Sequence, residues 1–342
     1  MGTRRSLRGY LESIRKTLLT DQEARSGDRA QHFSDSSLRG YLQQFGLVIA
    51  FLLLALTLTL LSNRFLTASN AINVLRQSTI NGIIAVGMTM VILTAGIDLS
   101  VGSILGLTAV ITADLLQRGW PVGLAVGAGL VLGAALGLIN GLLITKGRIP
   151  PFIATLGMMT LARGLALTYT QGRPITGLPA GFRFLGAGFI GPVPMPIVIA
   201  ALVFAMGYLL LTRTRVGEYI YALGNNVTAA RFSGIPTQRY ITLVYVISGF
   251  LSALAGMILV ARLDSAQPIV GQGYEFDAIA AVVVGGTSFA GGEGGLGGTL
   301  LGVLIIAVLN NGLNLLNVSS FYEQVVKGVV IALALLLHRV AR

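Results

Sequence analysis

Residues 121–145 read PVGLAVGAGLVLGAALGLINGLLIT, and this uncharged stretch decides the class of fold. A helix needs about 20 apolar residues to cross a hydrocarbon core about 30 Å thick. Four glycines, Gly129, Gly133, Gly137 and Gly141, recur at every fourth residue and therefore form one ridge. A ridge without side chains lets a neighbouring helix approach closely. The stretch predicts a transmembrane helix that packs tightly against other helices.

The rest of the chain has the same apolar character. Hydrophobic residues make up 54% of its 342 residues and charged residues only 11%. Soluble domains carry about 25% charged residues, so the predicted fold class is an all-α integral membrane protein. We expect about ten transmembrane helices, at residues 45–62, 79–96, 99–117, 121–145, 151–170, 193–212, 239–262, 275–289, 296–315 and 321–339. A second glycine ridge is expected at Gly294, Gly298 and Gly302.

Basic residues indicate how the chain is oriented. Lys and Arg are enriched in cytoplasmic loops, and most of them lie on one side if both termini are cytoplasmic. The net charge of +11 is therefore interpreted as membrane orientation and not as nucleic-acid binding. Residues 1–44 are polar and repeat the hexapeptide SLRGYL at 6–11 and 37–42. We expect a cytoplasmic N-terminal arm over 1–44 and a transmembrane domain over 45–342.

The two halves of the chain resemble each other. Residues 137–152 echo residues 309–321, with an Asn-Gly-Leu sequence in each. Each half then holds five spans, and an odd number requires the second copy to be inverted in the membrane. The sequence predicts two inverted five-helix halves.

Several kinds of chemistry are excluded in this chain. It has no cysteine and two histidines, His32 and His338, neither with a second metal ligand nearby. A phosphate-binding loop ends in Gly-Lys-Ser/Thr, but none of the three lysines follows a glycine. We expect no catalytic residues, no metal site and no cofactor here, so an ATP-driven transporter would need ATP and Mg bound by another subunit.

A few polar residues interrupt the apolar stretches, where an unpaired polar group is costly. Each of two aspartates opens a predicted helix, and helix capping is the first interpretation, with coupling-ion or substrate contact as the alternative. The asparagines either join helices or line a pathway, because amides suit polyhydroxyl solutes. The candidate pathway residues are Asp98, Asn140, Asp277, Asn310, Asn311 and Asn314.

The longest predicted cytoplasmic loop, about 213–238, carries a spaced motif. Thr228-Ala229-Ala230, three further residues and Gly234 match the spacing of the Glu-Ala-Ala-x-x-x-Gly coupling loop of ABC importer permeases, with Thr in place of Glu. In that family the loop is a short helix and turn that docks on an ATPase. The residues expected to form the coupling loop are Gly217, Gly224, Asn225, Thr228, Ala229, Ala230 and Gly234.

Longer strings at 87–103, 219–225, 273–288 and 310–316 resemble the monosaccharide, ribose-type permeases of bacterial ABC importers. The resemblance implies a permease subunit in the bacterial inner membrane that translocates ribose or a similar sugar. It also implies an ATPase subunit, a periplasmic sugar-binding protein, a second permease copy or paralogue, and a fold related to vitamin B12 importers. The alternative is an ion-coupled secondary transporter that uses Asp98 or Asp277.

Overall fold

The computed structural model describes residues 46–319, 322, 325–326 and 328–329. The expected arm over 1–44 lies outside the described residues, as does most of the expected span 321–339. The chain divides into two compact units, Met1–Ala50 and Phe51–Arg342. Nearly all of the described helices and strands belong to the second unit.

The described part of the second unit is helical, with four short strands. An apolar helix over Gly46–Leu61 leads into it. The elements that follow are α2 (Ala68–Leu93), α3 (Val101–Gln117), α4 (Val122–Thr145), α5 (Pro151–Thr170), β1 (Ile175–Thr176), α6 (Ala180–Ala187), β2 (Phe189–Ile190), β3 (Val193–Pro194), α7 (Met195–Arg213), α8 (Arg215–Asn225), α9 (Val227–Phe232), α10 (Thr237–Leu263), β4 (Ser265–Ala266), α11 (Tyr274–Val284) and α12 (Leu296–Leu315).

Five of these helices are long and apolar enough to cross a membrane: α4, α5, α7, α10 and α12. Their bounds differ from the predicted spans by at most two residues. Two other predicted spans, 79–96 and 275–289, differ in length from the helices that the structure shows. α2 begins at Ala68, eleven residues before the expected start, because the hydroxyl of Thr67 caps its first turn by accepting from the backbone N–H of Asn70. The expected span 275–289 is an 11-residue helix, since Gly285 ends it, and it is too short to cross the core.

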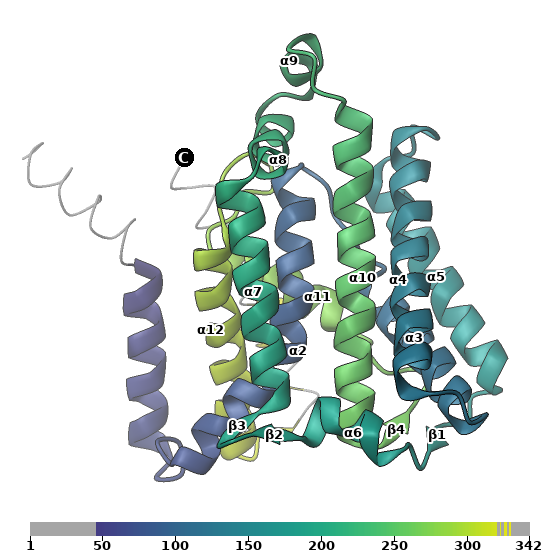
Figure 1. Ribbon diagram of the computed structural model, residues 1–342. Helices are drawn as coiled ribbons and strands as arrows, with labels where there is room; N and C mark the ends of the chain where they lie inside the picture. The colour runs from purple at the N-terminus through teal and green to yellow at the C-terminus, as the bar shows by residue number, and fades with distance from the viewer. Residues whose placement is uncertain (1–45, 320–321, 323–324, 327, 330–342) are drawn as a thin grey trace, which may run out of the picture. The chain divides into compact units, whose positions relative to one another are not determined.

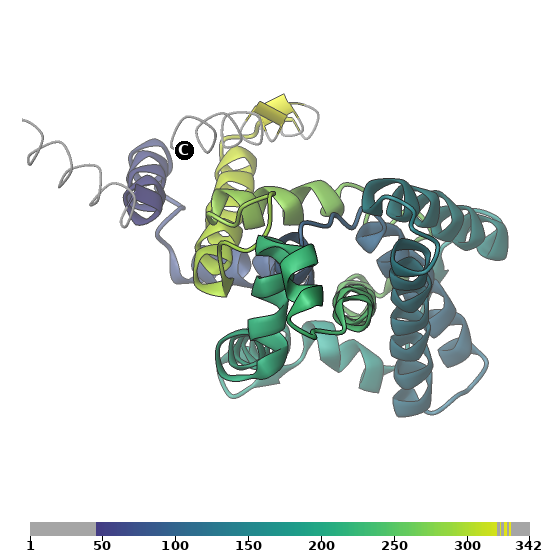
Figure 2. The same cartoon turned by 90° about the horizontal axis from the view of Figure 1, so that it is seen from above.

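The helix α10 lies at the centre of the unit, packed against α2, α3 and α4 (Figures 1 and 2). The predicted ridge of α4 meets it backbone to backbone. A Cβ atom at Gly133 would lie 2.5 Å from the Gly249 carbonyl oxygen, and one at Gly137 would overlap the Tyr245 carbonyl oxygen. The glycine ridge over 129–141 is thus confirmed as a helix-packing surface.

The second predicted ridge is only partly correct. Gly298 and Gly302 lie in α12 and pack against the backbone of Gly285 and Ala281. Gly294, in contrast, precedes α12 and has φ +125°, a conformation that favours glycine. It belongs to the loop between α11 and α12.

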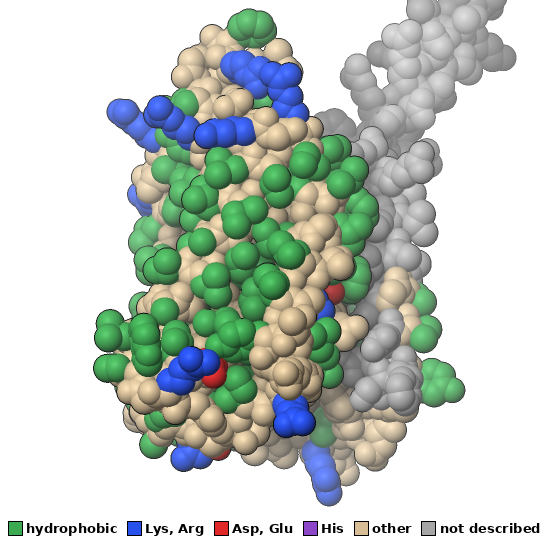
Figure 3. Space-filling view, turned by 90° about the vertical axis from the view of Figure 1, so that its right-hand side faces the viewer, with side chains coloured by type: hydrophobic (Ala, Val, Ile, Leu, Met, Phe, Trp, Pro, Cys, Tyr) green, Lys and Arg blue, Asp and Glu red, His purple; other side chains and the backbone are tan. Residues whose placement is uncertain are grey.

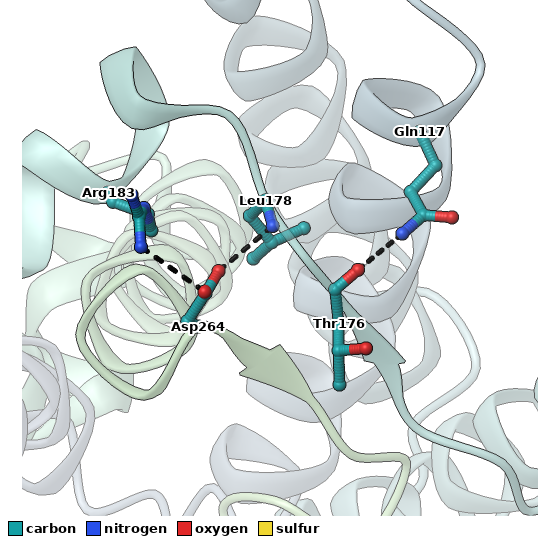
Figure 4. Close-up of polar contacts among 5 residues, drawn as sticks. All are labelled: Gln117, Thr176, Leu178, Arg183 and Asp264. Carbon is teal, nitrogen blue, oxygen red and sulfur yellow. Dashed lines mark hydrogen bonds and ion pairs between the residues drawn. The ribbon is translucent and has the colours of Figure 1, made fainter.

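The two ends of this unit differ in structure. At one end, α8 and α9 form a helical projection (Figure 1). At the other end lie α6 and two small antiparallel sheets, in which Ile175 pairs with Ala266 and Phe189 with Pro194. Asp264 holds this second end together, because its carboxylate accepts from the Leu178 N–H at 2.9 Å and from Arg183 at 3.3 Å (Figure 4). Gln117 donates to the Thr176 carbonyl nearby.

The face shown in Figure 3 carries hydrophobic side chains across its middle, with Lys and Arg side chains gathered toward both ends. Exposed large apolar side chains on the long helices include Leu124, Val131, Leu161, Leu202 and Met206. Exposed apolar patches of this extent indicate contact with lipid or another protein. The structure is that of a multi-pass membrane protein.

Candidate functional site

A cavity of about 1320 Å³ opens between α2, α5, α11 and α12. Ligand sites usually enclose about 300–1000 Å³, so this space is large enough for a small solute with water around it. The lining residues are Gln77, Asn81, Met159, Thr160, Arg163, Gly164, Leu167, Arg262, Ile269, Gln272, Gly273, Tyr274, Glu275, Phe276, Asp277, Asn310, Asn314 and Gly328. Asp277, Asn310 and Asn314 were expected in the pathway; Asp98, Asn140 and Asn311 do not line the cavity.

The formal charges of this lining sum to zero, because the positive charges of Arg163 and Arg262 equal the negative charges of Glu275 and Asp277. Three of the four also have partners within the chain. Arg163 donates to the Pro268 carbonyl at 2.7 Å and the Val270 carbonyl at 3.0 Å, and Glu275 accepts from the Gly273 N–H at 3.2 Å. Arg163 and Glu275 also attract each other electrostatically. These charges therefore fix the shape of the wall.

Amide side chains supply most of the other polar lining. Asn81 donates to the Asp277 carboxylate at 3.3 Å, which joins α2 to α11 at the cavity wall. The Asn81 Oδ1 and Asn310 Oδ1 atoms have no hydrogen-bond partner among the described residues. An unpaired carbonyl oxygen favours a hydroxyl donor. The wall therefore contains neutral amide groups with unused hydrogen-bonding capacity.

Asp98 belongs to a separate, closed cluster. It is fully buried, and its carboxylate accepts from the Ser100 hydroxyl at 2.6 Å, the Ser100 N–H at 3.0 Å and the Ser248 hydroxyl at 2.8 Å. Asn140 donates to the Ser100 hydroxyl at 2.9 Å. The cluster joins the start of α3 to α4 and α10, so Asp98 and Asn140 act as contacts between helices.

Neither aspartate is the N-cap that the sequence predicted. The N-cap of α3 is Ser100, two residues after Asp98, and that of α11 is Gly273, four residues before Asp277. Asp98 still accepts from a backbone N–H at the start of α3, but it does so from the turn before the helix. Asp277 lies in the first turn of α11, where the helix dipole favours a carboxylate, and it also lines the cavity.

Asn311 also joins helices. Its amide and that of Asn70 exchange two hydrogen bonds of 2.9 Å each, which connect α12 to α2. Asn310 and Asn314, on another face of α12, line the cavity. Neighbouring asparagines in one helix thus have different surroundings.

The expected coupling loop folds as two helices joined at a sharp turn. The Thr214 hydroxyl caps α8 by accepting from the Gly217 N–H at 3.4 Å, and Asn226 caps α9 by accepting from the Ala229 N–H at 2.9 Å. A Cβ at Gly217 would overlap the Leu211 carbonyl oxygen, which keeps α8 against the end of α7. The two capped helices and the turn between them form one projection, and the contact at Gly217 fixes its position against α7.

The expected coupling residues lie at different depths in this projection. Asn225, Thr228 and Ala229 are exposed, Ala230 is buried, and Gly234 has φ +82° just after α9. Gly224 packs against backbone deeper in the unit. Phe232 is 88% exposed at the end of α9 and was not predicted, although an aromatic residue within the motif spacing was a usable signal.

Tyr221 was also missed. Its hydroxyl donates to the Gly294 carbonyl at 2.9 Å, and burial raises the pKa of its phenol, so the donor stays protonated. The cavity residues Gln77, Asn81, Arg163, Gln272 and Glu275 were not predicted as site residues either. No short motif marks them, since they come together only when four helices pack.

An apolar helical bundle with a polar cavity and an exposed helical projection fits a membrane protein that moves a solute. A family model described as "Branched-chain amino acid transport system / permease component" matches residues 70–335. The chain belongs to this family of permease components.

Curated relatives cover most of the chain. It is 52% identical to the ribose import permease protein of Bacillus subtilis over 302 residues, covering 88% of this chain and 94% of that protein. It is 42% identical to the D-allose transport system permease protein of Escherichia coli over 80% of this chain and 85% of the relative. The E. coli xylose transport system permease protein is 35% identical over 86% and 91%. No solved structure matches the chain.

Proposed function

We propose that this chain is the membrane-spanning subunit of an ATP-driven importer and that it translocates ribose or a similar monosaccharide. The substrate class is inferred from one observation, the charges and amide groups of the cavity wall. Its charges balance and are mostly held by internal partners, whereas two of its amide oxygens, on Asn81 and Asn310, have no hydrogen-bond partner among the described residues. Amides donate and accept hydrogen bonds without charge, which suits a sugar.

This wall argues against an amino-acid substrate, despite the description of the family model. A zwitterion needs an unpaired cation and an unpaired anion at fixed positions, since a buried charge without a partner is costly. Arg163, Glu275 and Asp277 already have partners in the chain. The relatives named above are permeases for ribose, D-allose and xylose, which supports the same choice.

The rest of the assembly follows from the same proposal. An ATPase subunit, which binds ATP and Mg, docks on the exposed surface of α8 and α9. A second permease copy or paralogue completes the pathway, and a periplasmic binding protein delivers the sugar to the end formed by α6 and the small sheets. The chain lies in the bacterial inner membrane with both termini in the cytoplasm, and has ten helices in two inverted halves related to vitamin B12 importers.

The alternative, an ion-coupled secondary transporter, has no support. Asp98 is sealed among Ser100, Asn140 and Ser248 and has no access to the cavity. Asp277 is paired with Asn81. The family and the named relatives are permease components of transport systems.

The test is uptake by the purified complex in lipid vesicles. With the ATPase subunit and binding protein added, labelled ribose, xylose and allose are offered with ATP, and leucine is offered as the competing class. We expect ATP-dependent uptake of at least one sugar and no competition by leucine. Leucine uptake would overturn the substrate class, and uptake driven by an ion gradient without ATPase would overturn the energy source.

A further inference from the structure

Three backbone segments meet at the inner end of α8. The Gly292 N–H, in the loop between α11 and α12, donates to the Leu93 carbonyl oxygen, the last of α2, at 3.0 Å. Gly224 of α8 lies against both groups, and a Cβ atom on it would overlap the Leu93 oxygen and the Gly292 nitrogen. α8 therefore touches two different elements at one point.

Neighbouring contacts strengthen this junction. A Cβ atom at Gly291 would lie 2.8 Å from the Gly224 Cα and 3.0 Å from the Ala95 nitrogen. Gly291 and Gly292 have φ +85° and +73°, which other residues rarely adopt. Tyr221, one turn before Gly224, donates to the Gly294 carbonyl. Because the opposing atoms are backbone, no side chain can rotate away when α8 moves.

Both elements at the junction lead to the cavity. From Leu93, α2 runs back to Asn81 over about 18 Å at 1.5 Å per residue. From the loop after Val284, α11 runs back to Asp277 over about 10 Å on the same scale. At the cavity these two residues are joined by the hydrogen bond from Asn81 to Asp277. The junction lies at the end of α2 and in the loop after α11, and these two helices connect it to the hydrogen bond at the cavity.

We propose that Gly224 is a positioning residue that transmits movement of α8 to α2 and α11 together, and that the Asn81–Asp277 contact is the part of the cavity wall which this movement rearranges. Packed helices slide as rigid bodies during domain closure, and close-packed interiors transmit strain. The inference rests on the proposed function, in which an ATPase subunit docks on α8 and α9, and takes ATP binding there to move α8. The inference adds to the proposed function the route by which movement passes from α8 to the solute cavity.

The experiment measures the distance across the cavity wall in the complete complex. The chain has no cysteine, so Asn81→Cys with Asp277→Cys supplies the only thiols on this subunit. A short bifunctional thiol reagent reports their separation without nucleotide and with ATP plus vanadate. The pair is examined with Gly224 intact, with Gly224→Ala, and with Gly297→Ala, the matched control in α12, where a Cβ would meet nothing within 4 Å.

We expect the cross-linking yield to change with nucleotide in the Gly224 and Gly297→Ala chains, and not in the Gly224→Ala chain. In the chain without engineered cysteines, Gly224→Ala should lower ATP-driven uptake at least about fivefold, the lower range of ordinary coupling between sites. Tyr221→Phe, which removes only the hydroxyl that reaches Gly294, should reduce the nucleotide response in the same direction. The Tyr221→Phe variant provides the test if the complex with Gly224→Ala fails to assemble.

Three outcomes would overturn the inference: a nucleotide response that survives Gly224→Ala, the same loss of response in Gly297→Ala, or no response with Gly224 intact. The proposed function is tested separately, by uptake of sugar through the unmodified complex. A complex that imports sugar with ATP but shows no change between positions 81 and 277 would contradict only the route described above.

Discussion

Asp98 and Asp277 occupy similar places in the sequence, since each precedes or opens an apolar helix, yet their surroundings differ. Asp98 is fully buried and accepts three hydrogen bonds, two from Ser100 and one from Ser248. Asp277 lies in the wall of a large cavity and accepts from Asn81. The difference teaches that a carboxylate in an apolar sequence can be sealed between helices or can line a cavity, and that only its neighbours decide which.

The largest expected effect is on stability, at Asp98. Asp98→Ala leaves the Ser100 N–H and two hydroxyls without an acceptor, and each buried donor without a partner costs about 1–3 kcal/mol. We expect a loss of about 3 kcal/mol or more in the free energy of unfolding, measured by thermal or denaturant unfolding in detergent. Asp98→Asn, which keeps one acceptor oxygen, should lose less. Full stability of Asp98→Ala with abolished uptake would make this cluster a transport site and remove the contrast with Asp277.

The second effect separates two neighbouring asparagines. Asn311→Leu breaks the amide pair with Asn70 and leaves the buried Asn70 Oδ1 without its donor, although the Asn70 amide still donates to the Phe65 carbonyl; a buried acceptor without a partner costs about 1–3 kcal/mol. We expect lower unfolding stability, partly restored by Asn70→Leu in the same chain. Asn310→Leu, one residue away in the cavity wall, should keep its stability and raise the sugar concentration needed for half-maximal uptake. The reverse pattern in unfolding and uptake assays would place Asn311 in the pathway.

The third effect concerns transport at Asp277. Asp277→Ala removes the acceptor for Asn81 at the cavity wall, and we expect initial uptake to fall about tenfold, which corresponds to about 1.4 kcal/mol in the transport barrier. The midpoint of thermal unfolding should change little, in contrast to Asp98→Ala. Asp277→Asn is the matched control because it keeps the shape of the side chain. Equal losses of stability in the Asp98 and Asp277 variants would show that the cavity wall is ordinary packing.

The smallest effect is expected at a third aspartate, Asp264, whose ion pair with Arg183 is about half exposed. Exposed ion pairs contribute about 0–1 kcal/mol, so Arg183→Ala should shift unfolding by less than about 1 kcal/mol. Asp264→Ala should cost more, because it also removes the acceptor for the Leu178 N–H. A loss for Arg183→Ala as large as for Asp264→Ala, measured by thermal unfolding, would contradict this ranking.

Prediction from sequence succeeded for helices whose whole length is apolar. The bounds of α4, α5, α7, α10 and α12 could be predicted within two residues, because about 20 apolar residues in a row leave a bilayer span as the solution. It was less accurate for α2, whose first turns are polar, and for α11, which Gly285 ends. Hydropathy identifies the spanning part of a helix and not its polar extension.

The candidate site was predicted less well than the helices. Asp277, Asn310 and Asn314 do line the cavity, whereas Asp98, Asn140 and Asn311 join helices. Residue type indicated that each polar group needs a partner, but the partner of Asn311 is Asn70, 241 residues away in sequence. Arg163 lies inside the predicted span 151–170, and no sequence signal marks its carbonyl partners at 268 and 270, which it meets only because α5 packs against the loop before α11.

The sequence by itself determined that the chain is a helical membrane protein, that its Gly129–Gly141 ridge packs closely, and that residues 213–238 form a projecting loop. These properties are local, since composition, four-residue spacing and a short motif encode them. Only the tertiary structure decided which polar residues face the cavity, that Asp98 is sealed, and that Gly224 touches both α2 and the loop after α11. Those properties depend on which helix faces lie together, and a single polar residue carries the same cost in lipid whichever neighbour satisfies it.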